Sequence, residues 1–533
     1  ADYFLGGRDA TWLAIGASIF ASNIGSEHLI GLAGAGASSG MAMAHWEIQG
    51  WMILILGWVF VPFYTRSMVY TMPEFLERRY NPQSRTILSV ISLVSYVLTK
   101  VAVTVYAGGL VFQQVFGIKE LWGIDFFWIA AIGLVVLTAL YTIFGGMKSV
   151  LYTSVLQTPI LLLGSLIILV LGFKELGGWD EMMRVCGAVT VNDYGDTMTN
   201  LIRSNDDANF PWLGALIGSA IIGFWYWCTD QFIVQRVLSG KNEMEARRGT
   251  IFGAYLKLLP VFLFLIPGMI AFALHQKYIG AGGEGFLPML ANGTANADAA
   301  FPTLVAKLLP AGVKGLVVCG ILAALMSSLA SLFNSSAMLF TIDFYKRFRP
   351  ETPEKKLVGI GQVATVVIVI LGILWIPIMR SVGDVLYTYL QDVQSVLAPG
   401  IAAAFLLGIC WKRTSAQGGM WGLIAGMVIG LTRLGAKVYY SNAGEVADST
   451  FKYLFYDMNW LFFCGWMFLF CIIVVIVVSL ATKAPTAEKI QGLVFGTATK
   501  EQKAATRASW NHWDIIHTVI ILAITGAFYW YFW

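Results

Sequence analysis

About thirteen apolar stretches, each long enough to cross a membrane as a helix, constrain the fold of this 533-residue chain more than any other feature. Roughly 20 apolar residues cross the hydrocarbon core of a bilayer, and a helix satisfies its own backbone hydrogen bonds there. The sequence therefore predicts an all-α, multi-pass integral membrane protein. The stretches lie near residues 10–35, 45–65, 86–116, 124–143, 149–172, 211–234, 250–275, 313–342, 357–378, 385–409, 416–436, 460–481 and 513–533.

Composition and charge agree with that class. The chain is 57% hydrophobic and only 12% charged, against about 25% charged residues in a soluble domain. If the N-terminal end and every second loop are cytoplasmic, that side holds more than twice as many of the 35 lysine and arginine residues as the other side, as the positive-inside rule requires. The net charge of +4 is then a consequence of topology. It indicates no nucleic-acid partner.

Neither a soluble domain nor an enzyme is indicated. The longest polar stretches, 173–210, 276–312 and 483–511, are too short for a core of their own. The six cysteines lack CxxC or metal-ligand spacing, so neither a disulfide framework nor a zinc site is expected. The chain contains no phosphate loop, catalytic triad or HExxH motif. We expect no cofactor, and function must lie among the helices.

Transporters with a central site commonly repeat a five-helix unit in inverted topology, with the first helix of each unit broken at mid-membrane. The expected units are residues 10–172 and 211–410, followed by peripheral helices in 411–533. The first helix carries a polar interruption at residues 21–28, and Asn, Glu and His are expensive in lipid unless they line a cavity. This favours a break there. In the sixth helix, Gly218, Ser219 and Gly223 fit a break and close helix packing equally well.

Two sets of polar residues are candidates for binding. Ser327 and Ser328 share one helix face with the carbonyl of Ala324, and this stripe could hold a small hard cation such as sodium against Ala21 and Ile24. Alternatively, the two serines bond back to their own helix.

The second candidate set would suit a polyhydroxylated solute. It consists of Asn23, His28, Glu47, Lys257 and Gln391, and a charge at mid-bilayer costs about 2.5 to 3.5 kcal/mol, which marks it as functional. Alternatively, Glu47 and Lys257 lie near enough to the helix ends to reach water. The aromatic run 225–227 suits stacking on a sugar, although such clusters also form interfacial belts.

The run from Tyr226 to Gln231, continuing through Val234 to Arg236, resembles the sodium/glucose cotransporters of the sodium:solute symporter family. The likeness extends over about residues 1 to 435. It implies a LeuT-like inverted 5+5 repeat with broken first and sixth helices, alternating access, and sodium-coupled symport of a hexose, glucose or galactose, across a lipid bilayer.

The resemblance also implies residue roles. It makes Ala21, Ile24, Ala324, Ser327 and Ser328 the sodium ligands. It places Asn23, His28, Glu47, Lys257 and Gln391 on sugar hydroxyls, with Tyr226 beneath the ring as inner gate and Trp227 beside it. It assigns Leu32, Met43, Trp46 and Tyr387 to the outer gate.

Some features depart from the family pattern. Ser154 stands where members with a second sodium site carry aspartate, so one sodium per sugar is expected. Members with fourteen helices have one before the opening of this chain, so a further N-terminal helix is expected to precede residue 1. The loop 276–312 lacks the cysteines of animal members, which points to a bacterial inner membrane.

Several alternatives stay open. They are a sodium symporter of an amino acid, a carboxylate or sialic acid, and a sugar sensor that does not transport. The side chains do not distinguish glucose from galactose, and the sequence assigns no role to Lys100 or Arg433.

Overall fold

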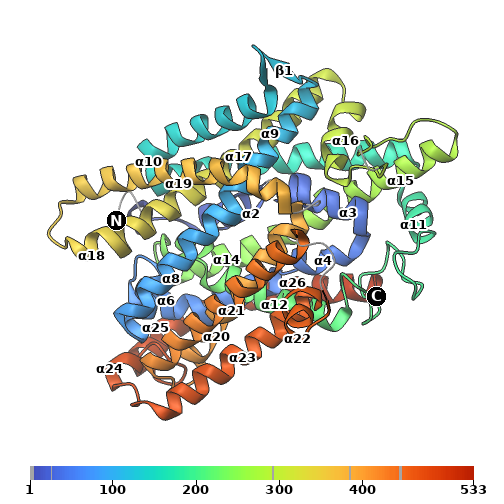
Figure 1. Cartoon of the computed structure of the whole chain (residues 1–533). Coiled ribbons are helices and arrows are strands. Elements are labelled where there is room, and N and C mark those ends of the chain that lie inside the picture. Colours follow the sequence, from blue (N-terminus) through green and yellow to red (C-terminus); the bar gives the residue numbers. More distant parts are fainter. Residues whose placement is uncertain (1–4, 26, 291–292, 383–385, 443–446) are drawn as a thin grey trace.

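The computed structural model describes residues 5–25, 27–290, 293–382, 386–442 and 447–533, without the side chains of 141, 143–146, 149, 377–382, 386–389 and 441–442. These residues form a bundle of helices (Figure 1). Its one small sheet within the described part is a hairpin in which β1 (Glu120–Leu121) pairs antiparallel with β2 (Ile124–Asp125).

The first part of the chain holds α helices and short 3₁₀ or π turns, the latter labelled η. They are η1 (Gly6–Arg8), α2 (Trp12–Asn23), η2 (Glu27–Leu32), α3 (Ala33–Ser39), η3 (Gly40–Met43), α4 (Ala44–Glu47), α5 (Gly50–Ile55), η4 (Leu56–Phe60), α6 (Val61–Ser67), α7 (Met72–Arg79), α8 (Pro82–Ser95), η5 (Tyr96–Val101), α9 (Ala102–Phe116), α10 (Phe126–Leu176) and α11 (Trp179–Gly187).

The middle part continues the bundle. Its elements are α12 (Trp212–Gly223), η6 (Phe224–Thr229), α13 (Gln231–Leu238), α14 (Glu243–Lys257), η7 (Val261–Leu265), α15 (Ile266–Gly280), η8 (Ala297–Ala299), α16 (Ala300–Leu308), α17 (Ala311–Met338), η9 (Leu339–Tyr345) and α18 (Lys346–Phe348).

The last part completes the bundle. Its elements are α19 (Glu354–Val382), α20 (Leu386–Cys410), α21 (Ala416–Asn442), α22 (Thr450–Lys452), η10 (Tyr453–Asp457), α23 (Trp460–Ala481), α24 (Ala487–Ile490), α25 (Lys500–Ala508) and α26 (His512–Tyr531).

Every apolar stretch expected from the sequence overlaps a helix. Among the described residues, 11 helices are long and apolar enough to cross a membrane, and the shorter apolar helices Trp12–Asn23 and Phe126–Leu140 cover further expected stretches. Helix α10 is assigned without interruption over 51 residues. A straight helix of that length would measure about 76 Å, more than twice the thickness of the hydrocarbon core, so this element accounts for two expected stretches.

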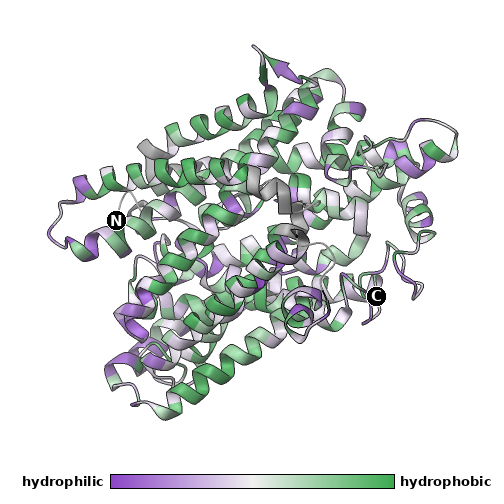
Figure 2. Cartoon of the chain, in the orientation of Figure 1, coloured by the Kyte–Doolittle hydropathy of each residue, from purple (hydrophilic) through white to green (hydrophobic). Residues whose placement is uncertain are grey.

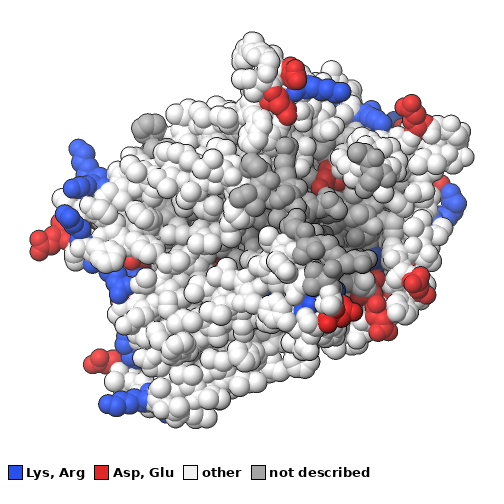
Figure 3. Space-filling model, in the orientation of Figure 1, with Lys and Arg blue, Asp and Glu red and all other residues white. Residues whose placement is uncertain are grey.

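The outer helices present apolar faces to the surroundings (Figure 2). On α23, exposed positions such as Trp466, Phe470 and Val477 are all apolar, which suits contact with lipid rather than water. Lysine and arginine gather at the end of the molecule where α18 and α24 lie (Figure 3). These elements belong to loops that the positive-inside rule assigns to the cytoplasm.

The first helix is broken where the sequence predicted it. Helix α2 ends at Asn23, and Ile24 is extended, with φ −79° and ψ 100°. Its backbone N–H still bonds to the carbonyl of Phe20, whereas the carbonyls of Ser22 and Ile24 accept from the Ser328 hydroxyl on another helix. The polar interruption therefore opens the helix inside the bundle.

The structure decides between the two alternatives left open for the sixth helix: it does not break at Gly218, Ser219 or Gly223. Helix α12 runs through Gly218 and Gly223 into η6, and the backbone becomes extended only at Asp230, with φ −75° and ψ 129°. The two glycines are packing positions, because a Cβ at Gly218 would lie 2.7 Å from the side chain of Leu461, and one at Gly223 would lie 2.6 Å from that of Gln49. Asp230 caps the following helix α13, accepting a hydrogen bond from a backbone N–H.

Arg433, which the sequence left unassigned, has a structural role. Its guanidinium donates to the backbone carbonyls of Leu454 and Met458, at 3.3 Å and 2.7 Å, and lies 4.1 Å from the ring centroid of Phe463. It therefore ties α21 to the segment that leads into α23.

Candidate substrate and sodium sites

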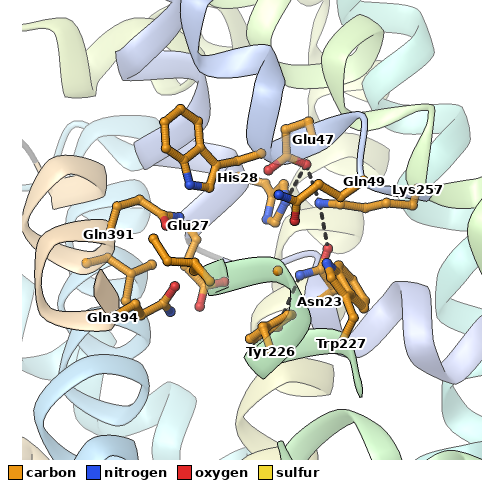
Figure 4. A pocket seen from close by; sticks show the side chains of 14 residues that line it. Asn23, Glu27, His28, Glu47, Gln49, Tyr226, Trp227, Lys257, Gln391 and Gln394 are labelled. Atoms are coloured by element: carbon orange, nitrogen blue, oxygen red, sulfur yellow. Dashed lines mark hydrogen bonds and ion pairs between the residues drawn. The ribbon is translucent and has the colours of Figure 1, made fainter. Parts of the chain in front are cut away.

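A polar pocket lies between the two helix breaks (Figure 4). The space in it that is open to the centres of water-sized molecules is about 50 Å³, so it is a small cavity in this structure. Its walls come from η2, α4, η6, α14 and α20, elements far apart in the sequence. It is lined by Asn23, Glu27, His28, Trp46, Glu47, Gln49, Ile222, Gly223, Tyr226, Trp227, Lys257, Leu390, Gln391 and Gln394.

One wall is a charged cluster. The Lys257 ammonium donates to Glu47 Oε2 at 2.5 Å, and His28 Nε2 lies 3.0 Å from the same oxygen. The side chains of Lys257 and Glu47 are 4% and 2% exposed, so neither reaches water and the alternative of solvation at the helix ends is wrong. Each charge is stabilised by the other, as buried charges in proteins generally are.

Asn23 connects this wall to the aromatic side of the pocket. Its Oδ1 accepts from Lys257 at 3.2 Å, and its Nδ2 donates to the Tyr226 hydroxyl at 3.1 Å. The Tyr226 ring meets the ring of Trp227 edge-on at 4.9 Å between centroids. Asn23 ends the first half of the broken helix, so the break fixes the position of the aromatic pair.

Three buried polar atoms on pocket-lining residues have no hydrogen-bond partner within the described part of the chain. They are His28 Nδ1, Trp46 Nε1 and Gln391 Oε1. Buried polar atoms are normally paired, and an unpaired one destabilises the protein by about 1 to 3 kcal/mol. In a neutral imidazole whose Nε2 donates to Glu47, His28 Nδ1 is an acceptor, as is Gln391 Oε1, whereas Trp46 Nε1 can only donate. A ligand that both donates and accepts would satisfy all three.

The pocket also contains residues that sequence reasoning did not select. Glu27 was noted in the polar interruption but given no role, and Gln394 lies one helical turn beyond Gln391, on the same face. That spacing was a usable signal for Gln394. The sequence carried no signal for Gln49. Its side-chain amide donates a hydrogen bond to the carbonyl of Ser219 at 2.8 Å.

Of the candidate sodium ligands, Ser328 and Ile24 come together at the first break. The Ser328 hydroxyl lies 3.1 Å from the carbonyl oxygen of Ser22 and 3.3 Å from that of Ile24. The alternative that Ser328 bonds back to its own helix is therefore wrong, because its partners lie on the broken helix. Ala21 and Ala324 are buried on the same two helices, α2 and α17.

Ser327 lies beside Ser154, the residue that stands where members with a second sodium site carry aspartate. Its hydroxyl is 3.5 Å from that of Ser154, which itself donates to the carbonyl of Val150 at 2.6 Å. A serine at position 154 supplies a neutral oxygen already engaged in its own helix. A carboxylate there would have added a charge for a second cation.

The predicted outer-gate residues occupy different settings. Leu32 and Met43 are buried in the main apolar core. Trp46 lines the pocket and stacks on Trp460 with 5.5 Å between ring centroids. The side chain of Tyr387 lies outside the described residues.

Lys100, the other unassigned charge, lies behind the aromatic side of the pocket. Its ammonium donates to Asp230 Oδ2 at 2.8 Å and lies 4.5 Å from the Tyr226 ring centroid. The hydroxyl of Tyr96 donates to the other oxygen of Asp230. This buried pair fastens η5 to the break in the sixth helix.

Comparisons with known proteins identify the class. The family model described as "Sodium:solute symporter family" matches residues 3–426. The chain is 37% identical over 516 residues to a sodium/myo-inositol cotransporter of Canis lupus familiaris, covering 92% of this chain and 71% of the relative. It is 39% identical over 499 residues to sodium/glucose cotransporter 1 of Ovis aries, covering 90% and 74%. These relatives are transporters, not enzymes.

Solved structures agree on the fold. A substrate-bound, outward-open Na⁺-coupled sialic acid symporter matches with a TM-score of 0.70 at 22% identity, over 91% of this chain and 93% of that one. MhsT in complex with L-phenylalanine matches with a TM-score of 0.50 at 12% identity, over 89% and 99%. Both have the LeuT-like fold of broken helices that the sequence predicted. The chain therefore belongs to the sodium:solute symporter family and is a multi-pass membrane protein that couples solute movement to sodium.

Proposed function

We propose that this protein imports a neutral hexose, glucose or galactose, together with one sodium ion, by alternating access. The observation that carries the proposal is the pocket beside the first helix break. There Lys257, Glu47 and Asn23 form a connected donor and acceptor wall, and Gln391 adds an unpaired acceptor among the described residues. Hydroxyl groups, which both donate and accept, suit such a wall.

The charge of the pocket favours a neutral solute over a carboxylate or sialic acid. Glu27 and Glu47 line it together with the single lysine Lys257, and Lys257 already binds Glu47 at 2.5 Å. No surplus positive charge remains on these three side chains for an anion. Removing a carboxylate solute from water without a cationic partner would be strongly unfavourable.

A cyclic polyol is the second candidate, because relatives at 37% identity are sodium/myo-inositol cotransporters. Inositol has six ring hydroxyls and neither a ring oxygen nor a hydroxymethyl group. A hexose ring has one position that accepts only. The two classes therefore differ in how they would use donors such as Trp46 Nε1, for which the described residues provide no partner.

The sodium would lie among the carbonyls of Ala21, Ile24 and Ala324 and the hydroxyls of Ser327 and Ser328. The contact of Ser328 with the Ile24 carbonyl, at 3.3 Å, supports this position. Sodium there would hold the two halves of the broken helix in the outward-open arrangement. Its departure would loosen the helix and favour release of the sugar inside.

Ser154 in place of a carboxylate supports a single ion. One charge moved through about 100 mV yields roughly 2.3 kcal/mol, and a tenfold sodium gradient adds about 1.4 kcal/mol. One sodium could then concentrate a neutral solute by up to about 500-fold, and two would square that ratio.

The domain units 10–172 and 211–410 are proposed as the inverted repeats. A bacterial inner membrane stays a prediction that rests on the cysteine-free loop 276–312.

Uptake into proteoliposomes tests the proposal. Labelled glucose, galactose and myo-inositol are compared under an inward sodium gradient, with potassium replacing sodium in the control. Accumulation of a hexose above equilibrium with sodium alone is expected. Accumulation of inositol with neither hexose would transfer the function to a polyol symporter, and competition only by sialic acid or proline would refute the neutral-sugar site. Sugar-induced fluorescence change without uptake would indicate a sensor.

A further inference from the structure

Glu27 is a carboxylate between the two sites that the proposed function leaves without a role. It opens η2, the element directly after the first helix break, and it lines the polar pocket with Asn23 and Gln394. Figure 4 shows its side chain pointing into the pocket between Gln391 and Tyr226. Within the described part of the chain it forms no ion pair, whereas Glu47 and Asp230 are each bound to a lysine.

The same carboxylate lies close to the candidate sodium ligands. A Cβ placed on Gly25 would be 2.5 Å from Ser328 Oγ and 3.3 Å from Glu27 Oε2. Because both distances start from one point, the two oxygens lie within about 6 Å of each other. Ser328 Oγ in turn contacts the carbonyls of Ser22 and Ile24. Glu27 therefore stands near the cation position and the solute position at once.

The five candidate sodium ligands have no formal charge. They are backbone carbonyls and serine hydroxyls, and the nearby Ser154 is neutral as well. In a buried site without a counter-charge, only the dipoles of these neutral oxygens compensate a cation for its lost hydration. For an ion about 6 Å from a carboxylate, at an effective dielectric constant of about 20, that charge would change the binding constant by on the order of 100-fold.

We propose that Glu27 is the counter-charge of the bound sodium and that this side chain couples sodium binding to the affinity of the solute pocket. This inference rests on the proposed sodium site at Ser328. With sodium present, the carboxylate is attracted toward the break and its orientation in the pocket is fixed. Without sodium, its charge is uncompensated and the pocket is less well ordered for an uncharged solute.

Sodium titration of thermal stability tests this role without a transported solute. The purified full chain is melted in detergent while sodium chloride replaces potassium chloride at constant ionic strength. The midpoint of the sodium-dependent stabilisation is compared for wild type, Glu27→Gln and Glu27→Asp. Glu181→Gln is the matched control, because Glu181 lies outside the pocket and pairs with Arg184, which is 71% exposed.

Glu27→Gln is expected to raise the sodium midpoint at least tenfold, with an unchanged melting temperature in potassium alone. Glu27→Asp, which keeps the charge, should stay within about threefold of wild type, and Glu181→Gln should match it. In wild type, glucose should bind more tightly in saturating sodium than in potassium. In Glu27→Gln, most of this difference in glucose affinity should be lost.

Two results would overturn the inference. One is a Glu27→Gln variant with a wild-type sodium midpoint. The other is an equal loss of stability in potassium and in sodium for both Glu27 variants, which would mean a structural role only. If wild type itself melts identically in both salts, the sodium site and this inference fall together. If wild type responds to sodium but not to glucose, the hexose proposal fails while the Glu27 comparison stands.

Discussion

Replacing Glu47 by glutamine is the sharpest test of how the pocket is held together. The change keeps the shape of the side chain and removes the charge that binds Lys257 at 2.5 Å and His28 at 3.0 Å. Lys257 would remain 4% exposed, with no compensating carboxylate at that position. Leaving one member of a buried pair in place is far less favourable than removing both, because the remaining charge keeps its desolvation penalty.

The magnitude follows from the geometry. Breaking a buried ion pair by removing one partner destabilises a protein by about 3 to 5 kcal/mol. A glutamine oxygen can still accept from the ammonium, and hydrogen bonds to charged groups contribute about 1.5 to 3 kcal/mol. We therefore expect Glu47→Gln to lower the free energy of unfolding by about 2 kcal/mol. The double variant with Lys257→Met should lose less than the sum of the two single changes, by about 0.5 to 3 kcal/mol.

Thermal unfolding in detergent, followed by sugar uptake at saturating sodium, measures both consequences. Glu47→Gln should lower the melting temperature and raise the half-saturating hexose concentration at least tenfold, because a contact to sugar hydroxyls is lost with the charge. Glu74→Gln is the control, since its pair with Arg78, which is 44% exposed, should contribute no more than about 1 kcal/mol. Strictly additive single and double variants would refute the coupled pair.

Three further outcomes are expected. Ser328→Ala removes the hydroxyl beside the Ile24 carbonyl and should raise the half-saturating sodium concentration at least tenfold while sugar selectivity is kept; an unchanged sodium dependence of uptake would exclude Ser328 as a ligand. Tyr226→Phe removes the hydroxyl that accepts from Asn23 at 3.1 Å and should weaken sugar binding by about 0.5 to 1.5 kcal/mol, whereas Tyr226→Ala should abolish accumulation, as measured in proteoliposomes. Gly25→Ala would put a Cβ 2.5 Å from Ser328 Oγ and should impair sodium-dependent uptake; Gly133→Ala, which meets nothing within 4 Å, should not.

Much of the site could be read along the chain because its signals are local. The polar interruption after Ala21 predicted a helix break, and the structure places extended backbone at Ile24. The spacing of Ala324, Ser327 and Ser328 predicted one stripe facing the broken helix; Ser328 does reach that helix, whereas Ser327 contacts Ser154 on α10. Gln394 could have been added from its spacing to Gln391.

Other features had no local signal. Glycine serves both to break a helix and to let another helix approach, so Gly218 and Gly223 did not reveal that the sixth helix opens at Asp230. Lys100 remained unassigned because its partner Asp230 lies 130 residues away. The local sequence does not indicate which polar residues on separate helices will contact each other.

The sequence by itself determined the class of protein, the positions of the helices and the break in the first of them. These properties depend on hydrophobic length and on the cost of polar groups in lipid, which are functions of the local chain. Only the tertiary structure decided that Glu47 and Lys257, 210 residues apart, share a bond, and that Glu27 stands between the two candidate sites. Those contacts depend on the packing register of neighbouring helices, which is set by the fit of whole surfaces and has no counterpart in the spacing along a single segment.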